Sequence, residues 1–155
     1  MKQPYLDTSL VVKLLVSEPL SDKVLAFLQE RRLAVPYTKL IEIETVNTLF
    51  AKAFRKEMTR SQLKQCQNLI GDFLKQGRFF RPVLSLDDVA AEALKTLPGI
   101  TGSTGCRTLD LMHVASAKLL GWREFVSTDK RQLQAAETAR LKPVDLTTWT
   151  PPALS

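Results

Sequence analysis

The sequence predicts a parallel α/β sandwich, because short apolar runs alternate along the chain with longer amphipathic segments. The short runs have the length of buried strands, and the longer segments repeat apolar residues with the period of 3.6 that marks a helix facing a core. The chain of 155 residues shows no internal repeat and no domain boundary. We therefore expect a single domain over residues 1–155.

The N-terminal stretch predicts a buried strand that is followed at once by a helix. Residues 4–6 are apolar, Asp7, Thr8 and Ser9 are polar, and residues 10–15 then repeat apolar side chains at helical spacing. In an open parallel sheet the functional crevice lies outside the carboxyl ends of the strands. The first strand is therefore expected to deliver Asp7 to that edge.

The middle of the sequence predicts a second short strand and a helical hairpin. Residues 33–35 are apolar and form the strand. Thr38 is expected to cap a helix that runs to about Lys56, and Thr59 to cap a second helix over residues 60–76. A short turn joins the two helices, so we expect them to pack as a hairpin.

The second half of the chain is expected to continue the alternation. Ser85 begins a helix over residues 86–97, and residues 98–105, rich in Gly, Ser and Thr, predict a mobile loop. The other expected elements are a strand over residues 79–84, a helix over 107–120, a strand over 124–126, a helix over 130–140 and a strand over 141–144.

The charge balance favours a polyanionic partner. The chain has 22 Lys and Arg against 16 Asp and Glu, a formal net charge of +6. A basic protein of this size attracts RNA or DNA, although solubility charge spread evenly over the surface gives the same total.

The remaining composition is that of an ordinary globular protein, with 45% hydrophobic and 25% charged residues. No apolar run approaches the roughly 20 residues of a membrane span, and the N-terminus lacks a signal-peptide pattern. Cys66 and Cys106 form no CxxC motif, which suits a reducing compartment. We expect a cytoplasmic protein with no membrane partner.

Two aspartates follow predicted strands in the same way. Asp7 follows the first strand, and Asp129 follows the strand at 124–126 through Ser127 and Thr128. Capping of the next helix is the commoner role for such residues. Two acids at two strand tips of one parallel sheet would nevertheless lie close together.

Two further acids lie on apolar helices. Asp110 and His113 supply the polar stripe of an otherwise apolar helix, where Asp110 either pairs with Arg107 or binds a metal. Glu44, or its neighbour Glu42, lies beside Asn47 on a largely apolar helix face. His113 is interpreted as a polar helix residue or a substrate contact.

Convergence of these carboxylates would require protonation or a divalent cation. Mg²⁺ or Mn²⁺ suits an all-oxygen site, whereas the single histidine disfavours Zn²⁺. Such ions can activate water and stabilise displacement at phosphorus. Acids in a basic protein therefore predict a phosphodiester substrate. P-loop, GxGxxG, HExxH and GxSxG motifs are absent from the sequence.

The ordered set of acids resembles the PIN-domain ribonucleases, and among them the VapC-type toxins of toxin–antitoxin pairs. The resemblance covers nearly the whole chain. It is carried by four short motifs: YLDTS at residues 5–9, LIEIETVNTL at 40–49, RTLDLMHVA at 107–115 and FVSTDKR at 125–131.

The resemblance implies a three-layer α/β/α sandwich with a mostly parallel sheet and Mg²⁺- or Mn²⁺-dependent cleavage of RNA. By position, the acids Asp7, Glu44, Asp110 and Asp129 look like the catalytic and metal-binding residues, and Glu44 is preferred to Glu42. The supporting residues are Ser9, Asn47 and Ser127. Candidates for RNA binding are Lys13, Arg107, His113, Lys130 and Arg131.

The resulting hypothesis is a metal-dependent endoribonuclease that acts as the toxin of a type II pair, with a small DNA-binding antitoxin as partner. The resemblance implies that the helical hairpin over residues 38–76 forms a homodimer and receives the antitoxin. Two alternatives stay open: a PIN-type nuclease in RNA or DNA processing outside a toxin pair, and a non-catalytic binding module with the same fold.

Overall fold

The strands are short, and each paired strand in the described part of the chain runs parallel to its neighbour. The computed structural model describes residues 3–151. The chain divides into two compact units. We call the stretch Thr8–Arg81 the middle unit, and the N-terminal residues through Asp7 together with the chain from Pro82 onward the terminal unit.

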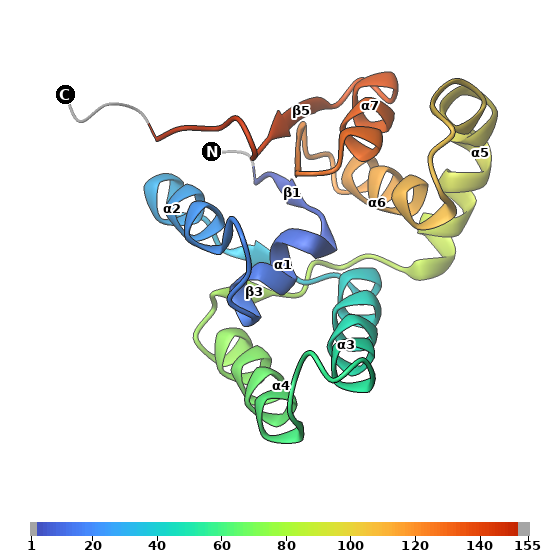
Figure 1. Ribbon diagram of the computed structural model, residues 1–155. Helices are drawn as coiled ribbons and strands as arrows, with labels where there is room; N and C mark the ends of the chain where they lie inside the picture. Colours follow the sequence, from blue (N-terminus) through green and yellow to red (C-terminus); the bar gives the residue numbers. More distant parts are fainter. Residues whose placement is uncertain (1–2, 152–155) are drawn as a thin grey trace. The chain divides into compact units, whose positions relative to one another are not determined.

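The terminal unit holds a three-stranded sheet in the order β1–β4–β5, with three helices packed against one another beside it in Figure 1. Its elements are β1 (Tyr5–Leu6), α5 (Leu86–Thr104), α6 (Thr108–Leu119), β4 (Glu124–Ser127), α7 (Lys130–Thr138) and β5 (Lys142–Asp145).

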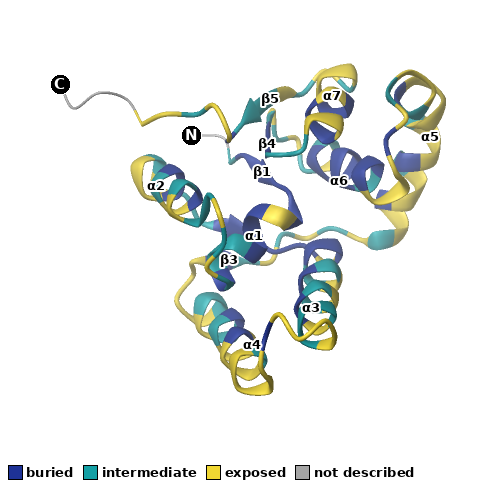
Figure 2. Ribbon diagram, in the orientation of Figure 1, coloured by how far each residue is buried: buried dark blue, intermediate teal, exposed yellow. Residues whose placement is uncertain are grey.

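The register of β1 on β4 builds the core of the terminal unit. Tyr5 pairs with Phe125 and Leu6 with Val126. The Tyr5 and Phe125 rings stack with centroids 5.5 Å apart, and all four side chains are fully buried. Figure 2 shows this buried backbone in dark blue. Close packing therefore fixes both strand ends, and with them the residues that follow.

The middle unit is mostly helical and pairs two short strands, β2 and β3. Its elements are α1 (Thr8–Leu15), α2 (Ser21–Arg31), β2 (Val35–Pro36), α3 (Lys39–Phe54), α4 (Arg60–Lys75) and β3 (Phe79–Phe80). The α3 and α4 helices contact each other, as the expected hairpin requires (Figure 1). No helix within residues 3–151 is long and apolar enough to span a lipid bilayer.

The predicted α/β class with parallel strands is confirmed. The helix starts are confirmed too, since Thr38 accepts a hydrogen bond from Ile41 N and Thr59 forms a capping box with Gln62. The expected strand over residues 79–84 is wrong in length, because pairing ends at Phe80, shortly before Pro82.

The mobile loop expected at residues 98–105 is wrong, because α5 continues through Thr104 and includes Pro98. Two hydroxyls of this last stretch bond back to helix carbonyls: Ser103 Oγ donates to Gly99 O at 2.8 Å, and Thr104 Oγ1 donates to Ile100 O at 2.8 Å. Ile100 is 4% exposed and ties the extension to the core. Gly105 then ends the helix with a φ of 63°.

Candidate active site

Asp7 stands at the carboxyl edge of the three-stranded sheet. Its backbone N–H donates to Val126 O at 3.2 Å, which continues the pairing of β1 with β4 by one residue. The side chain is 1% exposed. A carboxylate buried to this degree needs donors or a cation around it.

Ser127 links Asp7 to Asp129. Its buried hydroxyl donates to Asp7 Oδ2 at 2.5 Å and accepts the backbone N–H of Asp129 at 2.9 Å. The serine is the last residue of β4, directly after Val126 in the β1 register. The expected proximity of the two strand ends is therefore present in the structure.

Asp110 lies in the first turn of α6 and is 3% exposed. Its Oδ2 accepts the backbone N–H of Arg107 at 3.2 Å and the Nε of the same residue at 3.3 Å. Its Oδ1 accepts from Gln132 Nε2 at 2.8 Å. Both oxygens of this buried carboxylate therefore have protein donors.

Arg107 also approaches Asp129. The Nη2 of Arg107 lies 4.0 Å from Asp129 Oδ2, while Asp129 Oδ1 accepts the backbone N–H of Arg131 at 2.8 Å and caps α7. A continuous path of contacts thus joins Asp7, Ser127, Asp129, Arg107 and Asp110. The capping role of Asp129 and the pairing of Arg107 with Asp110, both weighed as alternatives, coexist in this network.

Gln132 belongs to this network although no sequence motif marks it. It is 9% exposed, its Nε2 donates to Asp110, and its Oε1 is a buried acceptor with no hydrogen-bond partner among residues 3–151. Gln132 lies one turn after Asp129, on the buried face of α7 beside Leu133. A polar residue on that apolar face is the signal that could have found it.

Glu44 lies in the middle unit, on α3. Thr8 Oγ1, from the residue after Asp7 in the sequence, donates to Glu44 Oε2 at 2.6 Å. Glu42 instead accepts two bonds from Arg81, each of 2.8 Å, and one of 2.6 Å from Lys39 Nζ. Glu42 is thus paired with two cations, and the preference for Glu44 stays a prediction.

The predicted supporting and RNA-binding residues differ in exposure. Lys130 and Arg131 are exposed at the start of α7, Arg107 is 71% exposed, and Ser9 and Asn47 are exposed in the middle unit. The side chains of Lys130, Arg131 and Arg107 are therefore open to solvent, as a phosphate contact requires.

Two RNA-binding candidates are engaged within the protein. His113 is 1% exposed, and its Nδ1 shares a hydrogen bond of 2.8 Å with Tyr5 Oη. It is a core residue in this structure, so we no longer assign it to RNA contact. Lys13 Nζ forms an ion pair of 3.3 Å with Glu18 Oε2, so its ammonium group is less available for the predicted RNA contact.

The model of the PIN domain family matches residues 5–138 of this chain. The chain belongs to the PIN domain family. The crystal structure of FitAcB from Neisseria gonorrhoeae is similar in fold: the TM-score is 0.59, the sequence identity is 16%, and the match covers 95% of this chain and 100% of that one. No curated protein matches this chain in sequence.

All four acids of this PIN domain lie within the matched residues, and PIN domains are generally nucleases that use divalent metals. The donor chemistry fits such an ion, because carboxylate and amide oxygens are the ligands of Mg²⁺ and Mn²⁺. The orphaned Gln132 Oε1 adds an acceptor beside Asp110. However, within residues 3–151 no three His, Cys, Asp or Glu side chains are arranged to hold a metal ion.

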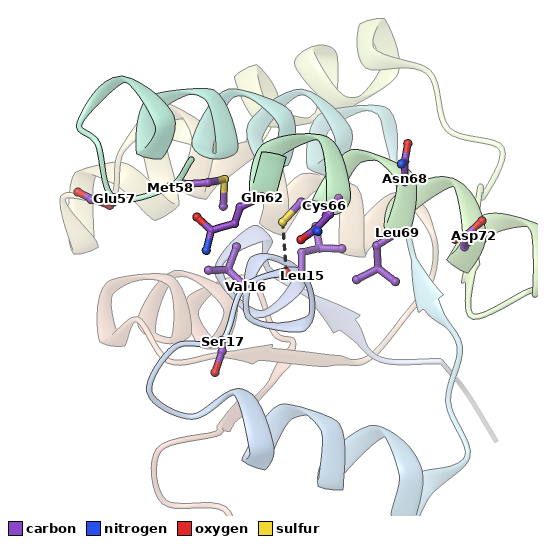
Figure 3. A pocket seen from close by; sticks show the side chains of 11 residues that line it. Leu15, Val16, Ser17, Glu57, Met58, Gln62, Cys66, Asn68, Leu69 and Asp72 are labelled. Atoms are coloured by element: carbon purple, nitrogen blue, oxygen red, sulfur yellow. Dashed lines mark hydrogen bonds between the residues drawn. The ribbon is translucent and has the colours of Figure 1, made fainter. Parts of the chain in front are cut away.

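An open pocket of about 490 Å³ lies in the middle unit of the PIN domain (Figure 3). Its walls are the end of α1 and one face of α4, and the Sγ of buried Cys66 donates to Leu15 O at 3.3 Å. Burial raises the pKa of this thiol. The pocket contains none of the four predicted acids.

Proposed function

We propose that this PIN domain is a Mg²⁺- or Mn²⁺-dependent endoribonuclease that acts as the toxin of a type II toxin–antitoxin pair. One observation supports the proposal above others: three aspartates from separate segments of the terminal unit share the contact path through Ser127 and Arg107. Exposed cations accompany this acidic network at the start of α7.

In the proposed mechanism, Asp7, Asp110 and Asp129 hold the divalent ion, with Glu44 as the fourth acid. When bound, the ion would activate water and offset the charge that develops on the phosphate. Ser127 and Gln132 fix the orientation of two of these carboxylates. The exposed Lys130 and Arg131 are suited to hold the RNA backbone beside the acids.

The helical hairpin of α3 and α4 is the proposed contact region for a second copy and for a small DNA-binding antitoxin. Its α3 helix exposes Ile43, Phe50 and Phe54, of which Phe54 is 87% exposed. Apolar exposure of this kind is typical of protein contact sites. The free thiols of Cys66 and Cys106 agree with the proposed cytoplasmic location.

The deciding experiment replaces Asp7 or Asp110 by Asn and measures cleavage of total RNA in the presence of Mn²⁺. Each change keeps the shape of the side chain and removes its charge, so we expect a rate loss of at least about 100-fold. Sequencing of the RNA ends defines the cut site. The matched control is Asp87→Asn, an exposed aspartate on α5 that is expected to keep the wild-type rate. Unchanged cleavage by the Asp7→Asn protein would rule out this site.

The toxin assignment has its own test. A toxin should arrest growth when it is expressed alone, and co-expression of an adjoining small DNA-binding protein should relieve the arrest. RNA cleavage without growth arrest would favour the alternative of a nuclease that works in RNA or DNA processing.

A non-catalytic binding module is the second candidate, because the described acids form no group arranged to hold an ion. Isothermal titration with Mn²⁺ near neutral pH separates the two. Binding that is lost in Asp110→Asn supports the nuclease, whereas a wild-type protein that binds no Mn²⁺ supports the module.

A further inference from the structure

The contacts of Asp110 and Asp129 give a reason why no three acidic side chains within residues 3–151 are arranged to hold a metal ion. Asp110 receives two donors from Arg107, and the same guanidinium stands 4.0 Å from Asp129 Oδ2. The Arg107 guanidinium therefore contacts two of the proposed metal ligands, Asp110 and Asp129. Its position supplies the charge that a divalent ion would otherwise supply.

Arg107 is attached weakly compared with the other partner of Asp110. The Arg107 side chain is 71% exposed whereas that of Asp110 is 5% exposed, and Nε lies 3.3 Å from Asp110 Oδ2, so the guanidinium end of the pair can exchange this contact for water. Gln132, by contrast, is 9% exposed and holds the opposite oxygen, Oδ1, at 2.8 Å. Departure of the guanidinium would leave Asp110 fixed from the other side by Gln132.

We propose that Arg107 is a displaceable internal counter-cation, which neutralises Asp110 and Asp129 and must swing outward before a divalent ion binds. This inference rests on the proposed metal-dependent function and changes the role of Arg107 within it. Arg107 then acts on the site through the carboxylates and is a positioning residue, whereas the sequence left both pairing with Asp110 and RNA binding open for it.

The test measures Mn²⁺ binding to the full chain by isothermal titration, without RNA, for the wild type and Arg107→Gln. Removal of the competing guanidinium should tighten Mn²⁺ binding about fivefold, the scale expected for one exposed ion pair. If Arg107 mainly supports the fold, Arg107→Gln should weaken Mn²⁺ binding instead. The direction of the change in Mn²⁺ affinity therefore separates competition from a structural role of Arg107.

The matched control is Arg131→Gln, which removes the same charge from an exposed residue next to the site. Only the backbone N–H of Arg131 contacts Asp129 in the network, and the substitution keeps that group. We expect Mn²⁺ affinity within about twofold of wild type, the residual effect of a screened charge in solution. Thermal unfolding in EDTA verifies that both variants are folded.

A second readout addresses the rival role of Arg107. If Arg107 mainly grips RNA, Arg107→Gln should weaken metal-free RNA binding at least as much as Arg131→Gln, which removes a proposed RNA contact, and should leave Mn²⁺ affinity unchanged; this result overturns the inference. Equal Mn²⁺ affinity of all three proteins, together with metal-dependent RNA cleavage by the wild type, overturns this inference alone. Failure of all three to bind Mn²⁺ overturns the proposed metal-dependent function as well.

Discussion

Two glutamates on α3, Glu42 and Glu44, have different surroundings although only one residue separates them. The Arg81 guanidinium, which donates two hydrogen bonds, and Lys39 outweigh the effect of burial and lower the pKa of Glu42 to about 2. Glu44 instead meets the hydroxyl of Thr8. The first arrangement stabilises the middle unit through charge, whereas the Thr8 hydrogen bond of Glu44 comes from a neutral hydroxyl.

The Glu42 pairing predicts a stability change with a defined pH window. Because the folded pKa lies below the ordinary value of 4.5, the contribution of Glu42 is complete above about pH 5 and is lost as the pH falls from 4.5 towards 2. Glu42→Gln should lower the free energy of unfolding at pH 7 by about 1 kcal/mol, after allowance for solvent screening. Urea denaturation at pH 7 and pH 3 measures the difference.

The control for this comparison is Glu137→Gln, an exposed glutamate on α7 that should change stability little at either pH. A Glu42→Gln effect of equal size at pH 7 and at pH 3 would contradict the assignment, because loss of side-chain packing alone does not depend on pH.

For single residues, the sequence predicted where the acids lie better than it predicted their hydrogen-bond partners. Asp7 and Asp129 could be placed because each follows a strand, and strand ends of a parallel sheet share one edge. The sequence could mark Gln132 only as a polar residue on an apolar face; its contact with Asp110 joins α6 to α7 and depends on how those helices pack. Of the two interpretations of His113, its burial favours the polar helix residue, and its partner Tyr5, 108 residues away, could not be found from the sequence.

At the scale of the element, α5 shows where local propensity fails. Pro, Gly, Ser and Thr favour turns in isolation, so the sequence indicated a loop. Burial of Ile100 in the core outweighs that preference in the folded chain. Tertiary contacts of this kind are invisible to a local pattern. Elements whose cap and period agree, such as α3 and α4, were predicted correctly for the opposite reason.

Substitution of two glycines tests the end of α5. Gly102 lies inside the helix with open space around the position of a Cβ, so Gly102→Ala should stabilise the protein by about 0.5–1 kcal/mol. Gly105 has a φ of 63° at the helix end, so Gly105→Ala should destabilise it by about 1–2 kcal/mol. Thermal unfolding of both variants provides the comparison, each serving as the control for the other. Similar small effects at both positions would indicate a loop.

At the scale of the whole molecule, the parallel strand pairing follows from the alternation that the sequence displays. The β1–β4–β5 order joins the first strand to the last two, which brings Asp7 to Ser127 over a separation of 120 residues. The sequence could suggest that these tips meet but could not show that the chain divides at Thr8 and Arg81 into two compact units. We propose that the units nevertheless unfold together as a single domain.

The two cysteines allow a direct test of that cooperativity, because each unit contains one buried thiol: Cys66 in the middle unit and Cys106 in the terminal unit. In single-cysteine variants, Cys66→Ala and Cys106→Ala, the remaining thiol reacts with a labelling reagent only after its surroundings open. A cooperative domain exposes both thiols with the same midpoint in urea, matching the fluorescence transition of the variant concerned. Labelling of one thiol at a clearly lower urea concentration, before the fluorescence changes, would show that the units unfold separately.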